Sequence, residues 1–175
     1  MKGKVKAAAV AVAVVYVASH AHGPGHGAAP ACGAPCPYRN PLRGAGVTPG
    51  RIDQGVDFTG LGPVYALGAG RVVSVRNSGW PGGAFVAYRL SGGPDAGWYV
   101  YAAEDINPSV RVGQKVGPST RLGTIAGSIE TGWAAPPPHV GESLARLSGQ
   151  WNSSQPATAD GISFRNLLES LGGVR

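Results

Sequence analysis

The sequence predicts an all-β domain that is followed by one or two short C-terminal helices. Short apolar and β-branched runs of strand length recur through the middle of the chain. Turn-forming residues separate these runs, and the 175 residues include 29 Gly and 15 Pro. Only the last part of the chain changes to the apolar spacing of a helix. Many tight turns and few helical segments together indicate one small β domain.

The first residues, 1–21, are predicted to be a secretory signal peptide. Lys2, Lys4 and Lys6 precede an apolar run over residues 7–18, and small residues then favour cleavage after Ala21. The run is shorter than the ~20 apolar residues of a transmembrane helix, so no transmembrane segment is expected. These features predict a secreted, extracellular protein.

The charge of the chain is modest once this segment is set aside. Its removal takes away three Lys and no acid, which lowers the formal net charge from +6 to +3. The remaining Lys and Arg are scattered, and no motif alternates basic with aromatic residues. Nucleic acid is therefore not an expected partner.

Residues 22–49 are predicted to form a flexible linker and an N-terminal arm. The stretch up to residue 37 is dominated by Gly, Ala and Pro. It contains the only two cysteines, Cys32 and Cys36. A secreted compartment permits a disulfide, whereas a redox motif has Cys-x-x-Cys spacing. We therefore predict a structural Cys32–Cys36 bridge that closes a small loop.

Residues 50–175 are predicted to form the β domain with its C-terminal helix. Turns are expected at 77–79 and 91–93, where Gly, Ser and Asn cluster. The apolar runs expected as strands cover residues 64–66, 71–75, 84–90, 98–102, 110–112, 122–126 and 129–134.

A helix is predicted near the C-terminus. Phe164, Leu167, Leu168 and Leu171 follow the spacing of one helical face. Ser163 is expected to cap the start, and the two glycines at 172–173 are expected to end it. A second short helix is predicted over residues 143–147.

Several motifs in the middle of the chain resemble one known family. The segment Asp53-Gln54-Gly55-Val56-Asp57-Phe58 leads into a small-residue run, Gly62 to Val73. Further matching segments are Tyr101–Ile106, Val112–Val116, Leu122–Gly127 and Glu130–Trp133. In this order, over roughly residues 50 to 135, they resemble the core of the lysostaphin-type zinc endopeptidases, which cut peptide cross-bridges in bacterial cell walls. The resemblance implies a duplicated-hybrid-motif β-sandwich or barrel core and a place in the cell wall.

The zinc-ligand histidines of that family are missing from this chain. Asp53 stands at one histidine position of the family pattern, and Glu130 and Gly132 stand at the final histidine pair. All four His of the chain fall outside residues 50–135, and that segment has no Cys. Catalytic zinc usually has three protein ligands that are rich in His nitrogen and Cys sulfur. We therefore expect no zinc-peptidase activity, no metal and no cofactor.

Carboxylates gather in the segments that match the family's metal-binding motifs. Five of the nine acids of the chain fall there: Asp53, Asp57, Glu104, Asp105 and Glu130. Together with Trp80, in a turn beside them, they are the predicted ligand-binding residues. Clustered carboxylates repel one another and raise one another's pKa. The energetic cost of this repulsion indicates that the cluster has a function.

Strand alternation predicts which residues of 129–134 face the expected groove. Glu130 and Gly132 share one face, with Glu130 exposed to solvent and Gly132 leaving room for a ligand. Trp133 is expected to pack on the opposite face.

Three functions remain open at this stage. The first is a binding module without metal, whose carboxylates hydrogen-bond a cell-wall glycan or peptidoglycan. The alternative is a glycoside hydrolase with Glu130 and Asp57 as the catalytic pair and Glu104 as a modulator, because two carboxylates suffice for that reaction. The third is a structural Ca²⁺ or Mg²⁺ site, because hard cations prefer oxygen ligands.

Overall fold

A computed structural model describes residues 35–77, 79–80, 82–153 and 157–173. The predicted signal peptide, most of the predicted linker and Cys32 lie outside the described residues. The Cys32–Cys36 bridge therefore stays a prediction.

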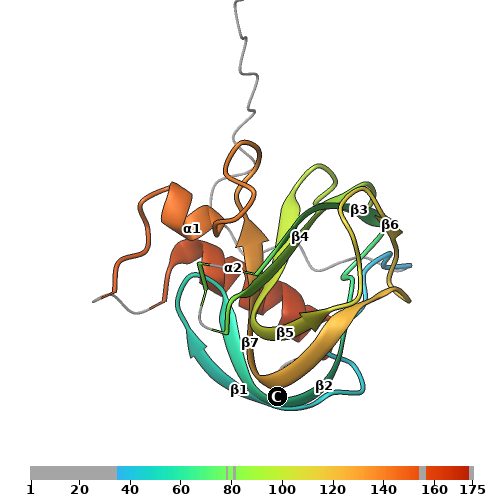
Figure 1. Ribbon diagram of the computed structural model, residues 1–175, viewed down its shortest axis with the longest axis horizontal. Coiled ribbons are helices and arrows are strands. Elements are labelled where there is room, and N and C mark those ends of the chain that lie inside the picture. The colour runs from blue at the N-terminus through green and yellow to red at the C-terminus, as the bar shows by residue number, and fades with distance from the viewer. Residues whose placement is uncertain (1–34, 78, 81, 154–156, 174–175) are drawn as a thin grey trace, which may run out of the picture.

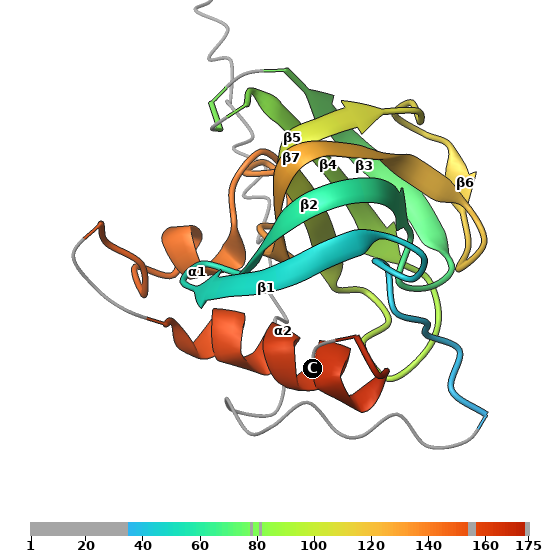
Figure 2. The same cartoon turned by 90° about the horizontal axis from the view of Figure 1, so that it is seen from below.

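The described residues form one curved antiparallel sheet of seven strands with two helices beside it (Figures 1 and 2). The order across the sheet is β1-β2-β7-β5-β4-β3-β6. The strands are β1 (Gly46–Ile52), β2 (Val56–Tyr65), β3 (Gly70–Arg76), β4 (Ala84–Leu90), β5 (Tyr99–Pro108), β6 (Lys115–Val116) and β7 (Arg121–Ala134), and the helices are α1 (Leu144–Leu147) and α2 (Ala159–Ser170). The predicted all-β class with short C-terminal helices is confirmed. Among the described residues, neither helix is long and apolar enough to cross a membrane.

The main hydrophobic core lies on one face of the sheet and is closed by α2. Phe58 of β2, Ile129 and Trp133 of β7, and Phe164 of α2 are all almost fully buried there. The rings of Trp133 and Phe164 meet edge to face with centroids 5.0 Å apart. Trp133 therefore packs on the side of β7 that alternation predicts.

The N-terminal arm is part of this core. Tyr38 and Leu42 are each 3% exposed and belong to the main cluster. β1 begins at Gly46, so the sheet starts before the expected domain boundary at residue 50.

A smaller aromatic cluster covers part of the opposite face of the sheet. Phe85 and Tyr101 are fully buried there and stack with ring centroids 5.3 Å apart. Trp80 lies against both rings. Because β7 carries packing on both faces, its last six residues are all buried.

The two helix N-caps hold the turn between β1 and β2. Thr158 caps α2, and its N–H and hydroxyl both donate to the carbonyl oxygen of Asp53. Ser143 caps α1, and its hydroxyl donates to Oε1 of Gln54 at 2.6 Å. The turn at 53–55 is thereby bound to segments about a hundred positions further along the chain.

The start of α2 corrects one expectation. Thr158, and not Ser163, is the N-cap, because the Thr158 hydroxyl accepts from the N–H of Gly161 at 3.0 Å. The predicted apolar stripe is nevertheless buried at Phe164, Leu167 and Leu168.

Thr158→Ala is expected to lower the free energy of unfolding by about 1–2 kcal/mol, because it removes the cap of α2 and one bond to the 53–55 turn. Thr158→Ser keeps the hydroxyl and is expected to retain most of the stability. Urea denaturation followed by circular dichroism measures both. An alanine variant as stable as the wild type would contradict this role of Thr158.

Candidate functional site

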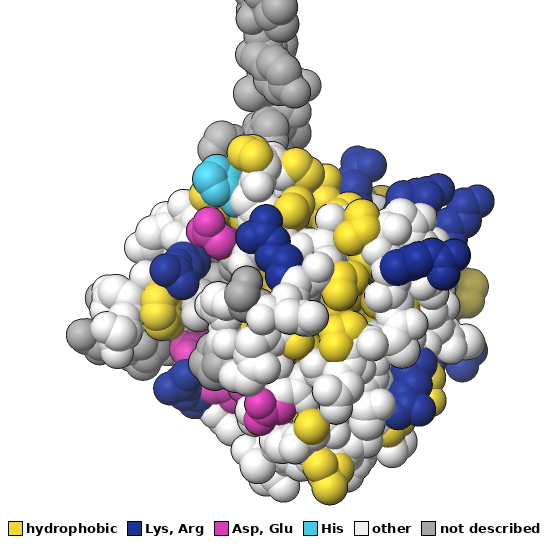
Figure 3. Space-filling model, viewed as in Figure 1, with side chains coloured by type: hydrophobic (Ala, Val, Ile, Leu, Met, Phe, Trp, Pro, Cys, Tyr) yellow, Lys and Arg dark blue, Asp and Glu magenta, His cyan; other side chains and the backbone are white. Residues whose placement is uncertain are grey.

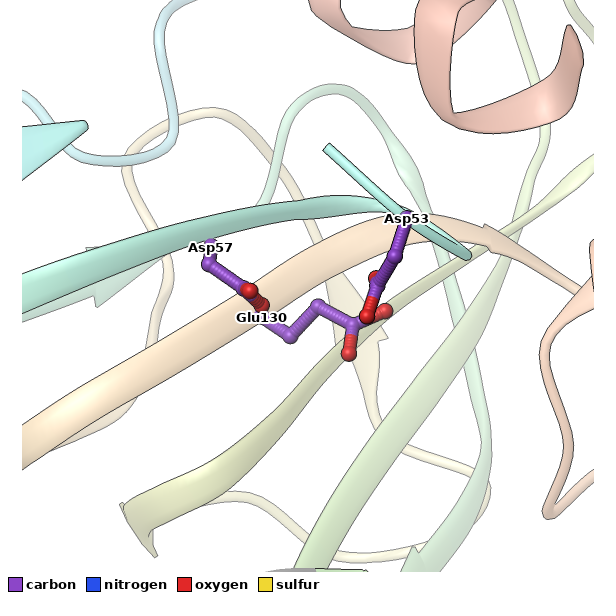
Figure 4. A group of neighbouring side chains, drawn as sticks. All are labelled: Asp53, Asp57 and Glu130. Atoms are coloured by element: carbon purple, nitrogen blue, oxygen red, sulfur yellow. The ribbon is translucent and has the colours of Figure 1, made fainter. Parts of the chain in front are cut away.

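Three carboxylates from two segments that are far apart in the sequence meet at one place on the sheet (Figure 4). Asp57 of β2 and Glu130 of β7 are directly paired across the strands, so their side chains share a face. Asp53 reaches the same place from the β1–β2 turn. One oxygen from each of the three lies within 4.8 Å of the others. The predicted convergence of Asp53, Asp57 and Glu130 is therefore present.

Arg51 supplies a positive charge to two of these carboxylates. Its Nε donates to Oδ2 of Asp57 at 2.7 Å, and its Nη2 lies 3.0 Å from Oδ2 of Asp53. The Arg51 side chain is 72% exposed, so it covers the cluster from the solvent side. Oδ1 of Asp57 is buried and accepts no hydrogen bond from the described residues.

Glu130 lies inside the protein, which corrects the expectation that it faces solvent. It is 2% exposed, and Oε1 accepts a hydrogen bond from the hydroxyl of Tyr101. Burial is the largest of the effects that together raise the pKa of Glu130 to about 8; the Tyr101 hydrogen bond lowers it, and the negative charges of Asp53 and Asp57 raise it. Glu130 is therefore largely protonated at neutral pH.

The other two groups of the cluster are also affected by burial. Burial, followed by the charge of Asp53, raises the pKa of Asp57, while Arg51 lowers it. Burial and the nearby Glu130 raise the pKa of the Tyr101 hydroxyl well above its ordinary value, so Tyr101 remains a hydrogen-bond donor.

Gly132 leaves no room for a ligand, contrary to expectation. A Cβ at Gly132 would lie 2.9 Å from Cα of Gly55 and 2.9 Å from Cε1 of Tyr101. A Cβ at Gly55 would lie 2.5 Å from the Tyr101 hydroxyl oxygen. The two glycines thus let the 53–55 turn and Tyr101 close over β7, and this packing is what encloses Glu130.

A cavity of about 150 Å³ opens beside the carboxylates. It has two half-buried tryptophans and charged groups of both signs in its wall. Its lining residues are Arg51, Asp53, Gln54, Gly79, Trp80, Glu104, Glu130, Arg146 and Trp151. Trp80 thus flanks the predicted site, and its indole N–H donates to the carbonyl of Gly141 at 3.2 Å.

Glu104 reaches the cavity from a strained position. Its φ is +76°, which costs an L-residue about 1–2 kcal/mol, and it lies at an irregularity of β5. Burial raises the pKa of Glu104, whereas a hydrogen bond from Ser128 lowers it.

Asp105 does not join the other predicted ligand-binding residues. It does not line the cavity and is not one of the three clustered carboxylates. Its Oδ2 instead accepts from the hydroxyl of Ser128 at 3.2 Å, and it packs beside Gly82 and Gly127.

The site does not fit zinc. Its three clustered donors are all carboxylates, with no His or Cys among them, and a guanidinium already neutralises two of them. The oxygen donors alone would suit Ca²⁺ or Mg²⁺. The Arg51 guanidinium, however, already supplies a positive charge to Asp53 and Asp57, which such an ion would have to bind.

The residues of the site that were not predicted include Arg51, Tyr101, Arg146 and Trp151. Arg51 had a visible signal, because it lies two positions before Asp53 and five of the nine acids fall near it in the matching motifs. Tyr101 reaches Glu130 only through the β5–β7 register, which pairs Tyr101 with Gly132. Arg146 and Trp151 depend on how α1 docks.

No family model matches the sequence, and no curated protein matches it. Solved structures with a similar fold include the following two. The crystal structure of CbpA from L. salivarius REN aligns at 16% identity with a TM-score of 0.46, over 69% of this chain and 76% of that chain. The NMR solution structure of lysostaphin aligns at 16% identity with a TM-score of 0.45, over 70% of this chain and 58% of that chain. At these values neither alignment assigns an activity, a ligand or a metal to this chain.

The wild type is expected to lose stability as the pH rises, and Glu130→Gln is expected to abolish this pH dependence. The pKa of Glu130 is about 8 in the folded chain against 4.5 for the ordinary group. The contribution of Glu130 to the free energy of unfolding is therefore fully present below pH 4.5 and is lost as the pH rises through 8. The amide imitates the protonated acid at every pH. Thermal midpoints from pH 4.5 to 8.5 test this, with Glu169→Gln, at an exposed position of α2, as the control. A variant less stable than the wild type at pH 8.5 would contradict the buried neutral carboxyl.

Metal analysis of the purified chain is expected to find well below one zinc per molecule, because the donor set lacks nitrogen and sulfur. Asp57→Ala is expected to leave that low value unchanged. One tightly held zinc per chain that disappears in Asp57→Ala would show that the carboxylates bind zinc after all.

Proposed function

We propose that this chain is a non-catalytic, metal-independent binding module for a bacterial cell-wall polymer, with peptidoglycan as the ligand. One observation carries the proposal: a cavity beside the sheet that combines two tryptophan rings with charged groups of both signs. With a signal peptide over residues 1–21, such a module would be secreted and associated with the wall.

The lining of the cavity matches the chemistry of peptidoglycan group by group. Trp80 and Trp151 offer flat apolar surfaces to sugar rings or aliphatic stems. Arg51 and Arg146 are donors for a peptide carboxylate. Glu104 is an acceptor for an ammonium or a hydroxyl.

The size of the cavity limits how the polymer is held. About 150 Å³ is well below the roughly 300–1,000 Å³ of pockets that enclose drug-sized ligands. One protruding group of the polymer, such as the end of a stem peptide, therefore enters the cavity, and the rest of the polymer lies outside it.

The glycoside hydrolase alternative has one observation in its favour. Glu130, largely protonated at neutral pH, lies beside Asp57, which pairs with Arg51, and such a division is what a general acid and its partner need. Against it, Glu130 is 2% exposed and already bonded to Tyr101. A general acid must come within hydrogen-bond reach of the leaving oxygen, and this burial prevents it.

Trp80→Ala and Trp151→Ala are each expected to weaken binding to purified peptidoglycan about tenfold, because each removes a ring from the cavity wall. Leu147→Ala, an exposed apolar residue of α1 outside the cavity lining, is the matched control and is expected to bind normally. Sedimentation with insoluble peptidoglycan measures binding, with and without a chelator. Equal weakening in all three variants would contradict a site in the cavity.

The same preparation separates binding from hydrolysis. The wild type is expected to release neither reducing ends nor peptide fragments from peptidoglycan during long incubation. Fragments released by the wild type and not by Glu130→Gln would establish the hydrolase alternative in place of the proposed function.

A further inference from the structure

Three cations stand side by side at the β6 end of the sheet. The register of β3 and β4 places Arg71 directly opposite Arg89. The register of β3 and β6 places Arg71 directly opposite Lys115. Directly opposite residues on antiparallel strands project from the same face, so Arg89, Arg71 and Lys115 form one row, here called the basic row.

The basic row is not neutralised by the protein itself. All three side chains are exposed, and within the described residues no ion pair involves any of them. Arg71 and Arg89 donate only to backbone carbonyls, those of Gly113 at 2.5 Å and Gly97 at 3.3 Å. These neutral acceptors hold the guanidinium groups in place without cancelling their charge.

The nearest acid along the chain does not change this. Asp95 lies in the β4–β5 connection close to Arg89, but it is half-buried and its backbone N–H binds Tyr38. Burial alone raises the pKa of Asp95, and no cation lowers it.

Like charges directly opposite one another destabilise a sheet. Here the arrangement occurs twice in succession across three strands, and the fold tolerates it at an edge. Figure 3 shows that Lys and Arg side chains gather on the side where β3 and β6 lie, while Asp and Glu appear toward β1 and α1. The repulsion among the three cations of the basic row would be relieved by an anionic ligand.

We infer that the basic row binds a linear polyanion of the polyol-phosphate type, at a surface separate from the cavity. Neighbouring strands lie about 4.8 Å apart, so the backbones that carry the three cations span about 10 Å across the strands. An extended polymer that carries a negative charge on every unit can meet all three at once. Tyr99, directly opposite Arg89 and half-exposed, extends the row with a ring that can pack on the polyol.

A compact single anion fits less well, because it would reach one or two of the three cations. Duplex nucleic acid is also a poor match, since three cations and no further basic strand offer few phosphate contacts. The straight row and its spacing therefore favour a flexible single-chain polyanion.

The test measures binding of the purified full chain to poly(glycerol phosphate) at several salt concentrations. If all three cations contact the polymer, a plot of the logarithm of the affinity against the logarithm of the salt concentration is expected to have a slope of about −2. Arg71→Gln combined with Arg89→Gln is expected to weaken binding at least about tenfold at low salt, with the slope reduced by about 1.4. The thermal midpoint of this variant is expected to equal or exceed that of the wild type, because a repulsion is removed.

Arg76→Gln combined with Arg165→Gln is the control, because it removes the same net charge from the opposite end of β3 and from α2. It is expected to bind the polymer as the wild type does. Equal weakening in the control, or no binding by the wild type, would overturn the proposal. Tighter binding to single-stranded DNA of equal charge would overturn it in favour of a nucleic-acid partner.

The result is independent of the cavity. Trp80→Ala is expected to leave poly(glycerol phosphate) binding intact, and the double variant of the basic row is expected to leave binding to peptidoglycan free of such polymers intact. Failure of either site can therefore be recognised separately from failure of the other.

Discussion

The candidate site depends on the bonds that hold the 53–55 turn to the starts of both helices. Thr158 bonds the carbonyl of Asp53, and Ser143 bonds the side chain of Gln54. These same two residues cap α2 and α1. One set of polar groups therefore docks the C-terminal segment, closes the cavity wall and orients Asp53, so the site exists only when the last part of the chain is in place.

The carboxylates survive burial because three different effects offset their mutual repulsion. Arg51 neutralises Asp53 and Asp57 from the solvent side. Glu130 avoids a charge by remaining protonated, and the Tyr101 hydroxyl satisfies one of its oxygens. An unpaired buried charge would cost several kcal/mol, so each of these effects is necessary. The cluster is therefore internally balanced without a metal ion, which agrees with a binding role better than with metal catalysis.

Sequence reasoning found the parts of the structure that follow from local pattern. The apolar runs predicted most of the central strands, and alternation placed Glu130 and Trp133 on the correct faces of β7. The run at 110–112 is not a strand, and β1 and β6 were not predicted. It failed where an outcome depends on tertiary packing. Glu130 was expected in solvent, because nothing in the sequence shows that Gly55 and Tyr101 meet above it. Ser163 resembles a helix cap as well as Thr158 does, and only the contact with Asp53 distinguishes them.

The pairing of β2 with β7 also restricts how the length of this chain can vary over evolution. Side chains alternate between two packed faces along β7, with Ile129 in the main core and Glu130 in the carboxylate cluster. A single inserted residue between Arg121 and Ile129 would exchange the two faces, placing a carboxyl among the core side chains and an isoleucine in the site. Insertions and deletions are thus more tolerable in exposed connections than in β7.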